Sequence, residues 1–302
     1  MAVRVGFKGS KLKSFKLADT IGTDIAFSSD NWSLPAINGT QQLFLGRFSE
    51  KDIRSIMQSI GLLRHLESLG FADIHIDVDR DANFINYCRL YWKDKIPDNL
   101  LIDLRVSEHT FIPHERFFEE GTEIEPYQMI LIEWLSAQNP LADFDERRPQ
   151  LPGQSKPGLG VLKYCFQLLY ITASEVFKDG FMDIPTHMHG AMMYAKAFKF
   201  FDPVQEAIMR AVMRDLRNYS LADISWGVIT ETIIDLDKNR PAVYDPGEQI
   251  HYVSRRMKQY FESPKYVSTF NKYYHRKKYR FDYEEMVRRR EEILRTKKIE
   301  DL

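Results

Sequence analysis

Two glycines flank one apolar residue in Lys156-Pro157-Gly158-Leu159-Gly160, directly before a long apolar stretch with helical spacing. Such a loop points backbone N–H groups outward at the start of a helix, where the helix dipole favours negative charge. The segment therefore predicts an anion-binding loop, and a pyrophosphate is a group of the kind that it suits.

Residues 148–202 predict the elements that would hold this loop. They indicate an apolar helix over 160–178, a short strand, a second helix that ends in an aromatic cluster, and another strand. Because the helix over 160–178 is apolar nearly all round, we expect it to be buried against a sheet. Its N-terminus would then be fixed at the edge of that sheet.

The residues before the loop predict most of this sheet. Ser49 is a candidate N-cap for an amphipathic helix that runs to Gly70. Strict alternation over Phe71–Asp79 is typical of a half-buried strand. The remaining strands are expected at Gln42–Arg47, at Leu100–Val106 and at Met129–Leu135, with Ile85–Trp92 as either a partner strand or a short helix.

The residues after the loop predict a cover for the sheet. Asp202 and Pro203 fit the N-cap and first position of a helix over Val204–Leu216. Ile224–Asp235 is expected to form a strand. A helical tail is expected from Tyr244, closing with a charged helix over Asp282–Ile299. This basic helix is expected to present a solvated face; the alternative is contact with an anionic partner. We expect an irregular segment over 1–41, a main domain over 42–235 and a helical extension over 236–302.

The bulk composition limits the class of protein. The 302 residues are 44% hydrophobic and 28% charged, as is typical of a globular protein, and the net charge of −1 gives no bias toward nucleic acid. No apolar run of membrane-spanning length and no signal peptide is present, and Cys88 and Cys165 favour buried reduced thiols, so we expect a cytoplasmic protein. Neither GxSxG nor GxxxxGK[ST] occurs, which disfavours a serine hydrolase and a P-loop enzyme.

The order of elements around the loop resembles the acyl-CoA-binding half of the GNAT N-acetyltransferase superfamily. That family has a Gln/Arg-x-x-Gly-x-Gly/Ala loop. Gly158, Leu159 and Gly160 fit this pattern, whereas Gln154 stands one residue too far upstream and Ser155 takes its place.

A second family signature, Asn-x-x-Ala-x-x-x-Tyr-x-Lys-x-Gly-Phe, resembles residues 187–200. Tyr194 and Lys196 are in register. The chain departs from the signature elsewhere: His187 replaces Asn, Gly190 replaces Ala, and Phe198 and Lys199 replace Gly-Phe.

The resemblance implies an α/β fold with a mixed, mostly antiparallel sheet flanked by helices. It implies a transferase that moves an acyl group from acetyl-CoA, or from another acyl-CoA, to the amine of a small molecule or peptide within a ternary complex. The cofactor pyrophosphate would be held by five residues of the loop: Gln154, Lys156, Gly158, Leu159 and Gly160. Tyr194 would protonate the departing thiolate as the acetyltransferase's general acid; the alternative is a core aromatic residue.

A general base is also expected, and the sequence leaves its identity open. Glu133 lies among apolar neighbours in the Met129–Leu135 strand, where desolvation would raise its proton affinity; alternatively it faces outward. In His187-Met188-His189, His187 could cap the helix in place of the family's Asn, or one histidine could be the base. A metal site is disfavoured because no third ligand is near in sequence.

Two further hypotheses follow from composition and from the departures. The Met, Phe and Tyr content of residues 164–201 permits an acyl chain longer than acetyl. The mismatches at Ser155, His187, Gly190 and Phe198 are what a non-catalytic GNAT-like ligand sensor or protein-interaction module would have, because a lost cofactor site tolerates drift.

Overall fold

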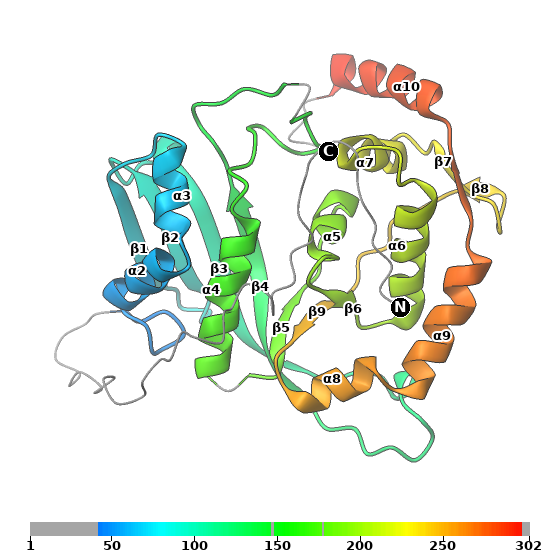
Figure 1. The fold of residues 1–302 in the computed structure, drawn as a ribbon, viewed down its shortest axis with the longest axis horizontal. Coiled ribbons are helices and arrows are strands. Elements are labelled where there is room, and N and C mark those ends of the chain that lie inside the picture. Colours follow the sequence, from blue (N-terminus) through cyan, green and yellow to red (C-terminus); the bar gives the residue numbers. More distant parts are fainter. Residues whose placement is uncertain (1–41, 146–147, 177, 298–302) are drawn as a thin grey trace.

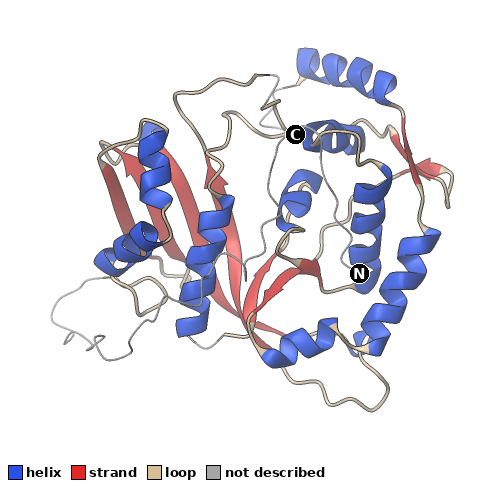
Figure 2. Cartoon of the chain, viewed as in Figure 1, coloured by secondary structure: helices blue, strands red, loops and turns tan. Residues whose placement is uncertain are grey.

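The computed structural model describes residues 42–145, 148–176 and 178–297, and it has a seven-stranded sheet covered by helices (Figures 1 and 2). The strand order is β1-β2-β3-β4-β5-β9-β6, and every neighbouring pair is antiparallel except β4 and β5. The strands are β1 (Ile74–Arg80), β2 (Asn86–Trp92), β3 (Leu100–Phe111), β4 (Tyr127–Ala137), β5 (Gly180–Asp183), β6 (Lys199–Phe200) and β9 (Gln249–Tyr252). The expected α/β class with a mostly antiparallel sheet is confirmed.

Three helices cover one face of the first four strands. They are α2 (Glu50–Ser59), α3 (Leu62–Ser68) and α4 (Leu162–Glu175). Ser49 caps α2 in a reciprocal capping box with Asp52, as the sequence predicts. The predicted single helix breaks at Gly61, whose φ of +82° is left-handed.

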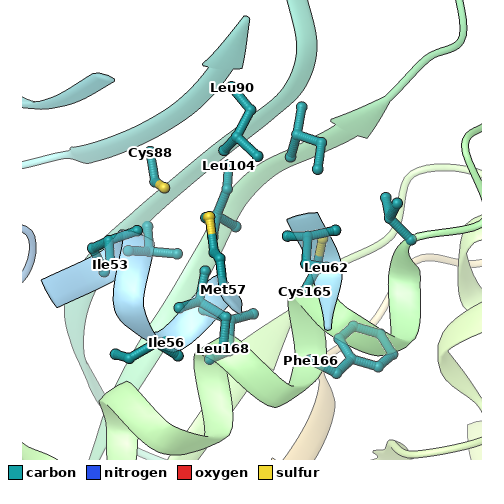
Figure 3. Close-up of a cluster of buried hydrophobic side chains, with 14 of the residues drawn as sticks. Ile53, Ile56, Met57, Leu62, Cys88, Leu90, Leu104, Cys165, Phe166 and Leu168 are labelled. Carbon is teal, nitrogen blue, oxygen red and sulfur yellow. The ribbon is translucent and has the colours of Figure 1, made fainter. Parts of the chain in front are cut away.

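The main core lies between these helices and the sheet. Side chains of α2 and α4 meet those of β2 and β3, with Met57, Cys88, Leu104 and Cys165 all buried there (Figure 3). Both cysteines are free and buried, as expected. Burial of such side chains is the main stabilising contribution in a domain of this size.

The remaining helices surround two further clusters of buried side chains. They are α5 (Met188–Tyr194), α6 (Pro203–Asp215), α7 (Leu221–Ile229), α8 (Arg255–Phe261), α9 (Pro264–Arg276) and α10 (Tyr283–Thr296). A small second sheet has the order β10-β7-β8, formed by Tyr279–Phe281, Ile233–Asp235 and Arg240–Pro241. Asp202 caps α6 through the N–H of Val204, and Pro203 is its first residue, as predicted.

Three predictions of secondary structure are wrong. No strand forms over 42–47; residues 44–48 form a turn closed by a single bridge between Phe44 and Phe48. The first half of Ile224–Asp235 is helical, because Ser220 and Asp223 form a capping box that starts α7 at Leu221, and only Ile233–Asp235 forms a strand. The tail from Tyr244 is not purely helical, since β9 lies inside the main sheet between β5 and β6.

The segment 1–41, predicted to be irregular, lies outside the described residues. Within the described ranges, none of the helices combines the length and the apolar character that crossing a membrane requires.

Candidate active site

β4 and β5 are the only parallel strand pair of the described sheet, and they pair over three residues only. Met129, Ile130 and Leu131 of β4 pair with Gly180, Phe181 and Met182 of β5. β5 ends at Asp183, whereas β4 continues for six residues beyond Leu131, to Ala137. Across the described part of the chain, this last stretch of β4 therefore pairs with β3 alone.

The glycine loop is fixed at the open end of β4. The N–H of Asn139, two residues after β4, donates to the carbonyl of Pro157 at 2.8 Å. His65 of α3 holds the other side, since its Nε2 lies 2.9 Å from the carbonyl of Leu159 and must donate to it. Gly160 has a φ of +69°, a conformation that other residues rarely adopt. The loop is thus held from both sides and turns the chain directly into α4.

The start of α4 differs from the starts of the other long helices. Among described helices of nine residues or more, α4 alone begins without a side-chain cap, its N-cap being Val161. Its first turn has no acidic residue, and Lys163 is exposed there. Lys156 lies 3.3 Å from Asp143, whose carboxylate is 95% exposed. Uncapped N–H groups and nearby cations make this end of α4 suited to an anion.

Gln154 is engaged within its own loop. Its side-chain oxygen is 3.4 Å from the N–H of Leu151, and its carbonyl accepts from Gln150 at 2.9 Å. The structure therefore gives Gln154 a part in shaping the loop. Lys156 and the backbone over 158–160 remain as the groups that could contact an anion.

Tyr194 lies close to the first turns of α4. Its ring packs edge-on against Phe166, with centroids 5.1 Å apart, and stacks on Phe198 at the same distance. Phe166 is four residues after the first residue of α4, which is about 6 Å along the helix axis. The structure thus brings together the two segments that carry the family resemblance. Tyr194 is 7% exposed, as the core-aromatic alternative predicts.

Asp183, which the sequence did not single out, hydrogen bonds with the Tyr194 hydroxyl. Burial raises the pKa of Asp183 to about 7, even though the Ile184 N–H and the Tyr194 hydroxyl stabilise its charged form. Burial and the nearby Asp183 raise the pKa of Tyr194 well above its usual value. A carboxyl with a pKa near neutrality can both accept and return a proton at physiological pH.

A signal for Asp183 was present in the chain. It is the charged residue that ends a short apolar strand, and it precedes the Tyr194 helix. Carboxyl groups at strand ends in such places are candidates for proton transfer when the fold buries them.

The expectation of an apolar environment for Glu133 is wrong. The pairing of β3 with β4 shifts so that Arg105 faces Trp134 and Val106 faces Ile132, which leaves Glu133 as the extra residue of a β-bulge. Glu133 is exposed and accepts a 2.6 Å hydrogen bond from Ser107. Because Ile132 packs in the main core beside α4, Glu133 lies on the opposite face of β4 from Tyr194.

The two histidines at the start of α5 form a stacked pair, with ring centroids 5.2 Å apart. His187 occupies the N-cap position, but its side chain does not cap the helix as predicted; its Nδ1 lies 2.9 Å from the Thr186 hydroxyl. Burial, together with the neighbouring His187, lowers the pKa of His189 to about 4. The described residues contain no group of three His, Cys, Asp or Glu side chains placed to hold a metal.

His251 of β9 is a second titratable group that sequence reasoning missed. It stacks on Phe181, and its Nδ1 donates to the Ala197 carbonyl at 2.8 Å, so its Nε2 is an acceptor. Burial lowers its pKa, which keeps the ring neutral near pH 7.

Compared with models of known protein families, with curated proteins and with solved structures, the chain matches none.

Proposed function

We propose that the protein is an acyl-CoA-dependent N-acyltransferase with a GNAT-like fold. The observation that carries this proposal is the parallel β4–β5 pair, which opens after three residue pairs. α4 connects the two strands, and its uncapped N-terminus with the glycine loop lies at the open end of β4. The glycine loop, to which the resemblance assigns the cofactor pyrophosphate, therefore lies beside an edge of β4 that pairs with no described strand.

The start of α4 would hold the pyrophosphate. Backbone N–H groups over Gly158–Lys163 supply hydrogen bonds, and Lys156 and Lys163 supply positive charge. Lys156 can leave Asp143 at small cost, because that carboxylate is almost fully exposed and exposed ion pairs contribute about 1 kcal/mol or less. The free edge of β4 beyond Leu131 would receive the pantetheine amides.

Asp183 and Tyr194 would move the protons. The amine nitrogen attacks the thioester carbonyl, the new C–N bond replaces the C–S bond, and CoA leaves as the thiolate. The proton of the amine passes to the Asp183 carboxylate, and Tyr194 donates its own proton to the thiolate and regains one from Asp183. In this scheme Asp183 replaces Glu133 as the base, because Glu133 lies on the opposite face of β4.

A non-catalytic GNAT-like module is the second candidate. The burial of Tyr194, at 7% exposure, favours it, because a general acid must reach the leaving sulfur. In that case the Asp183–Tyr194 hydrogen bond serves only to satisfy two buried polar groups.

Thiol release from acetyl-CoA and from C8–C16 acyl-CoAs, assayed with a mixture of primary amines, tests the proposal. We expect Asp183→Asn to lower turnover by about 10²–10⁴-fold, the range for loss of a general base, with Glu133→Gln as an exposed control that retains activity. Tyr194→Phe should lower kcat and leave CoA binding unchanged. Absence of calorimetric binding at millimolar CoA would end the enzyme proposal. Acetyl-CoA turnover equal to or better than that of the long chains would end the long-chain hypothesis.

A further inference from the structure

A groove of about 660 Å³ lies among α6, the β3–β4 connection and residues 233–248. This volume is within the usual range of small-molecule sites. Its floor is apolar and includes Met188, Ile208, Met209, Val212 and Val228. The glycine loop does not line it, so the groove is distinct from the proposed pyrophosphate site.

One end of the groove adjoins Asp183. Asp183 of β5 pairs with Gln249 of β9. Glu248, which directly precedes Gln249, lines the groove. Tyr244 lines it too, and its hydroxyl donates to the Pro185 carbonyl at 2.6 Å. Burial raises the pKa of Tyr244, and the negative charge of the nearby Asp183 raises it further. With Glu248 and Asp183, this end is acidic.

The other end of the groove is cationic. Lys238 and Arg240 line it, both are exposed, and neither forms an ion pair within the described residues. Lys277, by contrast, is neutralised by Asp235 at 2.7 Å. From Arg240 the chain runs without a turn to Asp245, a span of at most about 17 Å, and the four residues between them all line the groove.

We propose that this groove binds the acyl acceptor, and that the acceptor is an elongated amphipathic amine with a carboxylate at its far end. The amine would lie at the acidic end beside Asp183, the apolar chain along α6, and the carboxylate at Lys238 and Arg240. The role as acceptor rests on the proposed function; the charge pattern of the groove does not.

Calorimetry on the full chain without CoA tests this pattern, using 8-aminooctanoate, octylamine and octanoate as probes. We expect 8-aminooctanoate to bind at least about 10-fold more tightly than either singly charged probe, because each of its ends meets opposite charge. Lys238→Gln combined with Arg240→Gln should remove its advantage over octylamine. The matched control is Lys51→Gln with Arg64→Gln, one exposed lysine and one exposed arginine of α2 and α3 on the far side of the molecule, and it should change nothing.

Equal affinity for 8-aminooctanoate and octylamine, equal affinity for 8-aminooctanoate and octanoate, or no binding of any probe would overturn the inference. CoA affinity, measured separately, distinguishes the two proposals. CoA binding without probe binding rejects the acceptor groove and leaves the transferase standing. Probe binding without CoA binding rejects the transferase and retains a groove for zwitterionic amphiphiles.

Discussion

Replacing Asp183 with Asn should change how stability depends on pH. The raised pKa means that the folded protein holds a proton on Asp183 that the unfolded chain has already lost. Between the unfolded value of 3.8 and the folded value of about 7, the native state therefore binds more protons, and the free energy of unfolding falls as pH rises. Asparagine, which does not titrate, lacks this dependence.

The magnitude follows from the two pKa values. Integrating the proton difference between pH 5 and pH 8 at 1.36 kcal/mol per pH unit gives about 2.5 kcal/mol. Relative to wild type, Asp183→Asn should therefore gain about 2.5 kcal/mol of unfolding free energy as the pH rises over this range. The two proteins are compared by the difference in their unfolding free energies. His189 makes that free energy rise with pH below pH 6.5, opposite to Asp183, and its contribution is present in both proteins.

Urea unfolding of both proteins at pH 5, 6, 7 and 8 measures this difference. Glu133→Gln is the matched control, since it also exchanges a carboxyl group for an amide but at an exposed site, and its curve should run parallel to that of wild type. A constant offset between Asp183→Asn and wild type across the four pH values would mean that Asp183 is ionised throughout in the folded protein and that its pKa is not raised.

Three further predictions concern stability. Relative to wild type, His189→Gln should lose up to about 3 kcal/mol of unfolding free energy as the pH rises from 4 to 6.5, because unfolded histidine binds a proton that the buried ring does not; urea melts of both proteins across this pH range check this. Gly160→Ala should cost about 1–2 kcal/mol through its left-handed backbone, whereas Gly158→Ala should cost little, as thermal unfolding would report. Gly180→Ala should cost about 1–3 kcal/mol, because its Cβ would lie 2.4 Å from a backbone carbonyl of β9, and equal melting of wild type and variant would contradict this contact.

Much of the sheet could be predicted from local patterns. Strict alternation in β1 and the continuous apolar run in β4 each specify a strand, and Ser49 and Asp202 mark helix starts through caps that the structure contains. These signals are local, so the sequence alone carries them.

The errors come from non-local effects. β9 is four residues long, too short for a period to be visible, and it is a strand because β5 and β6 pair with its two edges. Glu133 faces outward because β4 bulges against β3, which no pattern within β4 reveals. Asp183 acquires its raised pKa from burial beside Tyr194, eleven positions further along the chain. Each of these features depends on which segments the fold brings together.

One pair of variants tests whether the start of α4 binds the pyrophosphate of CoA. A side chain at position 158 has room, since its Cβ would lie 3.6 Å from the nearest atom, the Ala137 carbonyl. Gly158→Glu and Gly158→Gln therefore place side chains of equal size beside the proposed anion site and differ only in charge. Calorimetric titration with CoA should give a Kd at least about 10-fold higher for Gly158→Glu than for Gly158→Gln. Equal CoA affinity of the two variants, or no binding to the wild type, would show that the pyrophosphate does not bind at the start of α4.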